Sequence, residues 1–397
     1  MAAIRPITRK EFDARTTVLA QHLRAENLAG VVLFDPSYVL YYTGFAYAPT
    51  ERPIAFILAA NGDRALFVPR LEFEHAGAKT GFERVDSYLE YPGKEHPMSG
   101  LAATMADMGL TGKVAADTDG YPWVYGYTGP ALSDVSGALV VPIARVIEDQ
   151  MMVKSQAEID LLRESTVWAN LAHVLLQRYT RVGETETEVT DRATTEATRA
   201  MTDALGSLYQ SQSLLGDGAF ALYRGQVGRN SAIPHALAGN LTFQAGDVLV
   251  TGASAPMWGY ISELERTMIM GLPSDKQRRL FEFMAGAQDT AMSAMRPGHT
   301  CSDVDRAVRS YYEEHDLMPY WRHHTGHGLG IRNHNPPFLD IGDHTALRPG
   351  MVFSVEPGLY VSEYGGFRHS DTVLITEDGN EMLTYYPRDI ESLTIPV

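Results

Sequence analysis

The sequence predicts an α+β protein with a smaller N-terminal α/β domain, placed at residues 1–150, and a larger C-terminal domain, placed at residues 154–397. The length of 397 residues exceeds the usual size of a single domain. In the second half, helical and strand patterns come in groups instead of alternating, which is typical of α+β proteins. Hydrophobic residues make up 45% of the chain, enough for two buried cores.

The N-terminal half carries the local signals of a compact α/β domain. Thr8 followed by Glu11 matches a capping box and predicts a helix that runs to about Glu26. Short apolar runs predict strands, and an Asn-Gly-Asp turn between two of them predicts a hairpin. The predicted strands are residues 31–34, 54–60, 64–68, 114–116 and 138–142.

The C-terminal half begins after a predicted hinge at residues 147–154. Ser155 and Glu158 form a second capping box, which predicts the start of a long helix. Further helices are predicted at residues 186–205, 276–295 and 302–315. The predicted strands are residues 241–243, 248–251, 266–270, 352–355, 359–361 and 373–375.

Composition excludes several classes of function. The net charge of -16 disfavours binding to phosphate backbones, so we expect no nucleic-acid partner. No apolar run of about 18 residues occurs, so we expect no membrane partner. The first residues are not followed by an apolar segment typical of a signal peptide, and the cytoplasm is the expected location. The single cysteine, Cys301, rules out an intrachain disulfide.

Three polar clusters stand among the apolar strand residues of the C-terminal half. Glu263 and Glu265 are two positions apart, so on a strand both side chains point to one face. Two such acids repel each other unless a proton or a cation lies between them. Glu356 closes an apolar strand, and His327 lies in a run of small residues that lets a ligand approach the backbone. At this point, solvated strand faces remain an alternative interpretation.

Five segments, in their order along the chain, resemble the creatinase, prolidase and aminopeptidase P superfamily. The resemblance covers nearly the whole C-terminal half and implies that this half is a catalytic domain with the "pita-bread" fold. It also implies a homodimer that acts on a small molecule, with the N-terminal domain of one subunit near the active site of the other. The segments are Asp247-Val248, Leu264-Glu265-Arg266-Thr267, Gly326-His327-Gly328-Leu329-Gly330, Val355-Glu356-Pro357-Gly358 and Gly366-Phe367-Arg368.

Metallopeptidases of this superfamily hold two metal ions with Asp, Asp, His, Glu and Glu. Those positions fall here on Gly252, Glu263, His327, Glu356 and Ser370. Gly252 and Ser370 offer no carboxylate, and Asp371 would face the other side of its strand. We therefore predict no two-metal centre and no cofactor. A single ion on Glu263, His327 and Glu356 remains an alternative.

The metal-free creatinase branch is similar at the segment Pro234-His235. That similarity implies that His235 is the general base and that Glu265 and Glu356 hold the cationic nitrogens of the substrate. The creatinase arginine that holds the substrate carboxylate is unmatched near Phe338, so we do not expect creatine itself. A cyclic amidine of the ectoine type would suit the two acids.

Further residues are predicted to contact the substrate. The resemblance to creatinase implies that Arg52 of the N-terminal domain reaches across the dimer to an anionic group of the substrate, with Tyr47 along the same edge. In the catalytic domain, Glu263, His327 and His334 would complete the substrate contacts.

The function predicted from the sequence is therefore a metal-independent, creatinase-like hydrolase of a C–N bond in an amidine, a guanidine or a cyclic amidine. A metal-dependent Xaa-Pro aminopeptidase or dipeptidase is the first alternative. A non-catalytic protein that binds a small molecule in the same cleft is the second.

Overall fold

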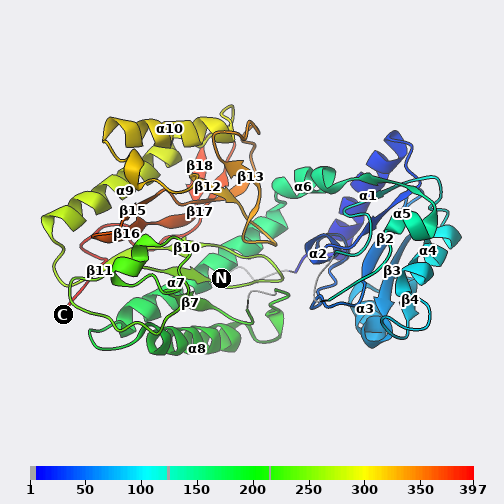
Figure 1. Cartoon of the computed structure of the whole chain (residues 1–397), viewed down its shortest axis with the longest axis horizontal. Coiled ribbons are helices and arrows are strands. Elements are labelled where there is room, and N and C mark those ends of the chain that lie inside the picture. The colour runs from blue at the N-terminus through cyan, green and yellow to red at the C-terminus, as the bar shows by residue number, and fades with distance from the viewer. Residues whose placement is uncertain (1–5, 123–125, 214–215) are drawn as a thin grey trace. The chain divides into compact units, whose positions relative to one another are not determined.

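The computed structural model describes residues 6–122, 126–213 and 216–397, so the expectation about a leader in the first five residues lies outside it (Figure 1). The chain separates into two compact units, with Ile7–Met151 in one and Met152–Val397 in the other. Most of the predicted hinge at residues 147–154 belongs to helix α6 (Ala144–Met152). The side chains of Ile147 and Met151 in this helix are buried.

The N-terminal unit contains one six-stranded sheet in the order β4-β3-β2-β1-β5-β6. The predicted hairpin is confirmed, since β2 and β3 pair antiparallel, whereas β1 pairs parallel with β5. The strands are β1 (Gly30–Leu33), β2 (Ala55–Ala59), β3 (Arg64–Pro69), β4 (Val85–Tyr88), β5 (Lys113–Ala116) and β6 (Leu139–Pro142). Besides α6, the helices are α1 (Arg9–Ala25), α2 (Pro36–Thr43), α3 (Phe73–Thr80), α4 (Pro97–Asp107) and α5 (Leu132–Ser136).

The first helix begins where the sequence predicts. Thr8 caps α1, because its hydroxyl oxygen accepts a hydrogen bond from the backbone N–H of Glu11 at 3.3 Å. Leu19 and Leu23 lie on the buried side of this helix. The core of the unit forms between one face of the sheet and α4, with Phe34 and Leu101 fully buried in it.

The C-terminal unit is built on a larger sheet with the strand order β13-β12-β14-β17-β10-β9-β7, to which β18 adds beside β17. A three-stranded sheet, β19-β11-β8, and the pair β15-β16 complete it. The strands are β7 (Phe220–Leu222), β8 (Val248–Val250), β9 (Gly252–Ser254), β10 (Leu264–Glu265), β11 (Thr267–Met270), β12 (Gly326–Gly328), β13 (Asn335–Leu339), β14 (Val352–Val355), β15 (Gly358–Val361), β16 (Gly365–Arg368), β17 (Ser370–Ile375), β18 (Asn380–Met382) and β19 (Thr394–Ile395).

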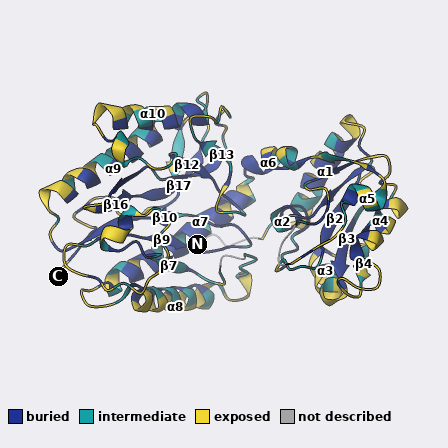
Figure 2. Cartoon of the chain, viewed as in Figure 1, coloured by how far each residue is buried: buried dark blue, intermediate teal, exposed yellow. Residues whose placement is uncertain are grey.

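Four long helices cover these strands, and they pack in two pairs, α7 with α8 and α9 with α10. Figure 1 shows α9 and α10 along one side of this unit and α8 along the opposite side. Their exposed residues face outward, while the strands between them are buried (Figure 2). The helices are α7 (Gln156–Tyr179), α8 (Glu186–Leu205), α9 (Asp275–Ala294) and α10 (Cys301–Glu314).

Sequence and structure agree on the long helices of this unit and on five of the predicted strands. The short strands β7, β9, β12, β13, β16, β18 and β19 were not predicted, and one predicted strand is absent. The capping box of Ser155 and Glu158 at the start of α7 is confirmed. The predicted strand at 241–243 is wrong, since only Thr242 makes an isolated bridge there. The segment pairs only with the loop at residues 183–186, where the backbone N–H of Phe243 donates to the carbonyl oxygen of Glu184 at 3.0 Å, and the Glu186 carboxylate accepts the N–H of Leu241 at 3.2 Å. The contact is therefore too short to form a strand.

Candidate metal centre

Three potential metal ligands lie on or directly beside strands of the larger sheet. Glu263 immediately precedes β10, His327 is the central residue of β12, and Glu356 immediately follows β14. In the sheet, β12 pairs with β14, β14 with β17, and β17 with β10. Consecutive pairing of these strands brings together three residues that are far apart in the sequence.

Glycines allow this close approach. A Cβ atom on Gly326 would lie 2.1 Å from the carbonyl oxygen of Ser354, and one on Gly328 would lie 2.8 Å from that of Asn335. Both contacts are with backbone, which cannot move aside as a flexible side chain would. The small residues on both sides of His327 therefore let β12 sit against β14 and β13, and they set the position of the imidazole.

The three side chains form one cluster. One ligand atom from each of Glu263, His327 and Glu356 lies within 4.8 Å of the other two. His327 Nε2 is 3.2 Å from Glu356 Oε1 and 3.9 Å from Glu263 Oε2. The imidazole is fully withdrawn from solvent, while the two carboxylates keep a small exposed fraction. An ion could therefore reach the cluster from the carboxylate side.

Burial and mutual charge shift the pKa values of all three groups. Burial, together with repulsion from Glu356, raises the pKa of Glu263 to about 7. Burial alone would lower the pKa of His327, but the two carboxylates outweigh it and raise the pKa to about 9. The pKa of Glu356 is lowered despite its burial, because His327 and Arg368 stabilise the anion.

These residues fit a divalent ion. His327 Nε2 is buried and has no hydrogen-bond partner among the described residues. The other ring nitrogen, Nδ1, lies 3.1 Å from the carbonyl oxygen of Gly328, to which its N–H donates. That bond favours the tautomer with a lone pair on Nε2, as in histidines that bind metals. One imidazole and two carboxylates match the ligand set of a catalytic ion with open positions.

A second charged group, centred on Glu265, adjoins this cluster. The Glu265 carboxylate accepts hydrogen bonds from Arg368, whose Nη2 lies 2.9 Å from Oε1, and from Arg224. Arg368 Nε is also 3.7 Å from Glu356 Oε2. Glu265 thus has two guanidinium partners in the structure, and its predicted contact with a substrate cation remains a prediction.

The predicted orientation of the strand residues around the site agrees with the observed contacts. Ser370 faces the cluster, where its hydroxyl donates to Glu263 Oε1 at 2.6 Å. Asp371 faces the opposite side and pairs with Arg266, with both side chains fully buried. Asp371 is therefore a structural ion-pair partner and cannot replace the missing ligand at Ser370.

The two remaining histidines of the predicted site differ in their surroundings. His334 stacks on His327, with ring centroids 3.6 Å apart. Burial and the positive charge of His327 lower the pKa of His334 to about 4, so its ring is neutral at pH 7. His235 is exposed, although the preceding carbonyl oxygen, that of Pro234, accepts a hydrogen bond from Arg368 at 3.5 Å. Its role as a general base is not tested by these contacts.

The two N-terminal residues of the predicted site have partners within their own unit. The hydroxyl of Tyr47 donates to the carbonyl oxygen of Phe34 at 3.3 Å, and Arg52 pairs with Glu51. Their contact with a substrate remains a prediction, as does the homodimer that it requires.

Sequence reasoning gave no role to two residues that surround the cluster. Arg224 was not identified from the sequence, because a single arginine after a short strand forms no motif that indicates a functional site. The hydroxyl oxygen of Tyr360 accepts a hydrogen bond from Arg368 Nη1 at 3.0 Å and lies 2.7 Å from His323 Nε2. The hydrophobic strand around Tyr360 predicts burial but does not indicate this polar contact.

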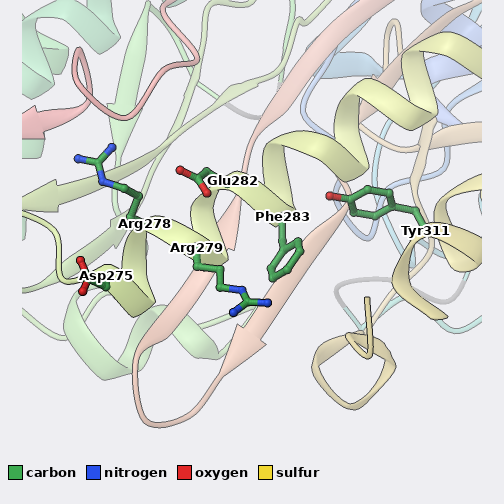
Figure 3. Close-up of a pocket in the computed structure, with 6 residues that line it drawn as sticks. All are labelled: Asp275, Arg278, Arg279, Glu282, Phe283 and Tyr311. Carbon is green, nitrogen blue, oxygen red and sulfur yellow. The ribbon is translucent and has the colours of Figure 1, made fainter. Parts of the chain in front are cut away.

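A surface hollow lies elsewhere, between α9 and α10 (Figure 3). It contains none of the three clustered ligands, and its Arg278 pairs with Glu391 on the surface. Its lining residues are Asp275, Arg278, Arg279, Glu282, Phe283 and Tyr311. We place the chemistry at Glu263, His327 and Glu356, because burial, shifted pKa values and convergent ligands coincide there.

Fold and site together define the class of protein. The profile of metallopeptidase family M24 matches residues 160–377, and that of the creatinase/prolidase N-terminal domain matches residues 15–153. The chain belongs to metallopeptidase family M24, and the predicted pita-bread fold is confirmed. Among the described residues, no helix is long and apolar enough to cross a membrane.

Named relatives are similar over nearly the whole chain. A probable dipeptidase PepE from Mycobacterium tuberculosis is 31% identical over 396 residues, which cover 98% of both chains. The Xaa-Pro dipeptidase of Pyrococcus furiosus is 27% identical over 383 residues, 95% of this chain and 99% of its own. The structure of dipeptidase PepE from Mycobacterium ulcerans superposes with a TM-score of 0.81 at 26% identity, covering 99% of this chain and all of the other.

These findings correct the predicted function. The prediction of a metal-independent, creatinase-like hydrolase is wrong, because similar proteins are named as Xaa-Pro dipeptidases and the structure gathers a set of metal ligands. The error came from giving the loss of carboxylates at Gly252 and Ser370 more weight than the three ligands that were kept as a single-ion alternative. Three ligands remain, and the strand pairing holds them together.

Proposed function

We propose that this protein is a metal-dependent, prolidase-like peptidase that hydrolyses the C–N bond before proline in short peptides. The observation that carries the proposal is the convergence of Glu263, His327 and Glu356 within 4.8 Å, with an unpartnered imidazole nitrogen among them. The similarity to proteins named Xaa-Pro dipeptidase supports the choice of substrate.

An ion bound to these residues would supply a Lewis acid for the peptide carbonyl and lower the pKa of a coordinated water. The residues of the chain prepare that chemistry. Arg368 lies beside Glu356 and keeps that carboxylate ionised, which makes it a ligand over the whole physiological pH range. The bond of His327 Nδ1 to Gly328 fixes the ring plane, so that Nε2 points at the carboxylates.

We assign His334 a contact with the substrate. His334 is an exposed residue overall, but one face of its ring is covered by the buried His327, on which it stacks. Because its pKa is lowered to about 4, the neutral ring still carries one N–H at pH 7. We assign this N–H the task of donating a hydrogen bond to the oxygen on which charge develops during hydrolysis.

Two further parts of the proposal concern the substrate and the assembly. Arg52 and Tyr47 would bind the anionic end of the peptide from the neighbouring subunit of a homodimer. A short peptide is a zwitterion, so such a pair would favour substrates with a free carboxylate near the scissile bond.

The test is hydrolysis by the full chain of Leu-Pro and Ala-Pro beside Leu-Ala, with products identified by mass. The protein is stripped with a chelator and then reloaded with Mn²⁺, Co²⁺ or Zn²⁺. We expect proline-containing dipeptides to be cleaved only by reloaded protein. His327→Ala should abolish the activity, and His344→Ala, at an exposed histidine, should leave it intact. Full activity in verified metal-free protein, or no cleavage under any loading, would overturn the proposal.

A further inference from the structure

We propose that the guanidinium of Arg224 occupies the place in which the two-metal peptidases of this superfamily hold their second cation, so that this centre takes one divalent ion per chain. The inference rests on the proposed function for that one ion. It concerns the space beside Gly252, where the first metal-binding aspartate of those peptidases would stand.

The space beside Gly252 is already filled by charged groups. A Cβ atom on Gly252 would lie 3.6 Å from Glu265 Oε1, 3.8 Å from Arg224 Cζ and 3.9 Å from Arg224 Nε. These are ordinary van der Waals distances, so a side chain could begin at this position. Any longer side chain would then run directly into the guanidinium and the carboxylate. A cation placed there would lie against the positive charge of Arg224.

The backbone holds Arg224 in this place. Arg224 follows β7 and has a φ of 53°, a left-handed conformation that is uncommon for a residue other than glycine. Gly225 comes next with a φ of 74°, and a Cβ there would lie only 2.0 Å from the carbonyl oxygen of Leu237. The guanidinium bonds to Glu265 and reaches Gln226 Oε1 at 3.3 Å. A strained turn and two polar partners therefore fix the arginine, although 40% of its side chain remains exposed.

At Ser370, where the two-metal peptidases have their last glutamate, the side chain makes a different contact. Ser370 Oγ donates to Glu263 Oε1 at 2.6 Å, which leaves Oε2 as the oxygen that faces His327 at 3.9 Å. Glu263 therefore has one oxygen directed toward the ion site and one held by a hydroxyl. A carboxylate that bridges two ions needs both oxygens, so this arrangement suits a single ion.

The balance of charge leads to the same conclusion. Glu263, Glu265 and Glu356 face two guanidiniums, those of Arg224 and Arg368, so the carboxylates exceed the guanidiniums by one. One divalent ion changes this to a single excess positive charge. A second ion would add two more positive charges in a largely buried site without any further ligand to offset them.

The first measurement is the stoichiometry of Mn²⁺ binding to the metal-free full chain, by isothermal titration calorimetry and elemental analysis. One ion per chain is expected. If the protein binds two ions per chain and hydrolyses Xaa-Pro dipeptides, this inference is wrong and the proposed function is still supported. No bound ion at all would sink both.

The second measurement isolates Arg224. Arg224→Met removes a positive charge beside the ion, so we expect it to bind the first Mn²⁺ about tenfold more tightly. Arg229→Met, at an exposed arginine of the same segment, should leave the affinity unchanged. Equal affinity in wild-type protein and Arg224→Met would contradict the role given to Arg224.

A third arm restores the absent ligands. The double variant Gly252→Asp with Ser370→Glu should still bind one ion, because Arg224 pairs with the new carboxylate at position 252. Addition of Arg224→Ala to this double variant should allow a second ion to bind. Arg224 does not exclude the second cation if the double variant binds two ions. The same conclusion follows if the folded triple variant, which also carries Arg224→Ala, binds only one ion. Thermal melting checks the fold of each variant, and the first two measurements decide the question if these variants do not fold.

Discussion

His327 Nε2 lies 3.2 Å from Glu356 Oε1, and the described part of the chain offers it no other hydrogen-bond partner. A buried imidazole nitrogen this close to a carboxylate needs either a proton or a cation between the two groups. In metal-free protein the proton fills that role, which is why the pKa of His327 is raised to about 9. The same geometry would suit these two groups as ligands of a divalent ion.

A methyl group on Gly326 should disturb the site through the sheet. Its Cβ would meet the carbonyl oxygen of Ser354 at 2.1 Å, so Gly326→Ala must push β12 away from β14 and move His327. We expect Gly326→Ala to lower the free energy of unfolding by about 1–3 kcal/mol and to weaken Mn²⁺ binding. Gly379→Ala is the control, since its Cβ meets nothing within 4 Å. Equal Mn²⁺ affinity in the two variants would contradict the packing argument.

Asp371 should matter for stability rather than for catalysis. Its carboxylate pairs with Arg266 at 2.8 Å, and both side chains are fully buried. Asp371→Ala leaves a guanidinium buried without its counter-ion, which destabilises proteins by about 3–5 kcal/mol. Urea unfolding should show this loss, whereas Asp378→Ala, at an exposed position, should change stability by less than about 0.5 kcal/mol. A loss below about 1 kcal/mol for Asp371→Ala would show that the pair is dispensable.

Acid should destabilise the catalytic unit through His173. This histidine is fully buried, and desolvation lowers its pKa to about 3, below the value of about 6.5 in an unfolded chain. The unfolded state therefore binds a proton between those two values while the folded state does not, so stability falls as the pH drops below about 6.5. Between pH 7 and pH 5, this one group should remove about 2 kcal/mol.

The measurement is the change in unfolding free energy with pH in wild-type protein and in His173→Gln. The variant should lose less stability on acidification, and His344→Gln, at an exposed histidine, should follow the wild type. Parallel pH slopes in wild type and His173→Gln would mean that His173 is protonated in the folded state.

His334 should affect turnover more than metal binding. His334→Phe retains an aromatic ring to stack on His327 but removes the N–H that we assign to the reacting oxygen. Loss of one such donor typically lowers kcat by about 10²–10³-fold. Steady-state kinetics on Leu-Pro should show a lower kcat with the Mn²⁺ affinity unchanged. A selective loss of Mn²⁺ affinity would instead make His334 a structural support for the ion site.

The sequence predicted the local elements well where the pattern was strong. The helix at 186–205 has a capping box and coincides with α8, and the apolar run at 352–355 coincides with β14. The segment at 241–243 was wrong because it pairs only with a distant loop, residues 183–186, through one bridge and a few backbone hydrogen bonds. Such a contact depends on tertiary structure and leaves no local pattern in the sequence.

The site could be predicted only in part. Motif resemblance identified Glu263, His327 and Glu356, but whether three ligands suffice for an ion depends on distances that strand pairing sets. Arg224 could not be found, because its position results from a left-handed backbone turn that arginine rarely adopts. The sequence therefore identified which ligands were missing, and the structure located the arginine beside the first of them.

The most direct test of the account is the metal content of purified protein, measured by elemental analysis together with Leu-Pro hydrolysis before and after chelation. We predict one divalent ion for each chain, loss of hydrolysis when that ion is removed, and recovery when it is returned. A protein that carries no ion and cleaves Leu-Pro at an undiminished rate would contradict the central claim.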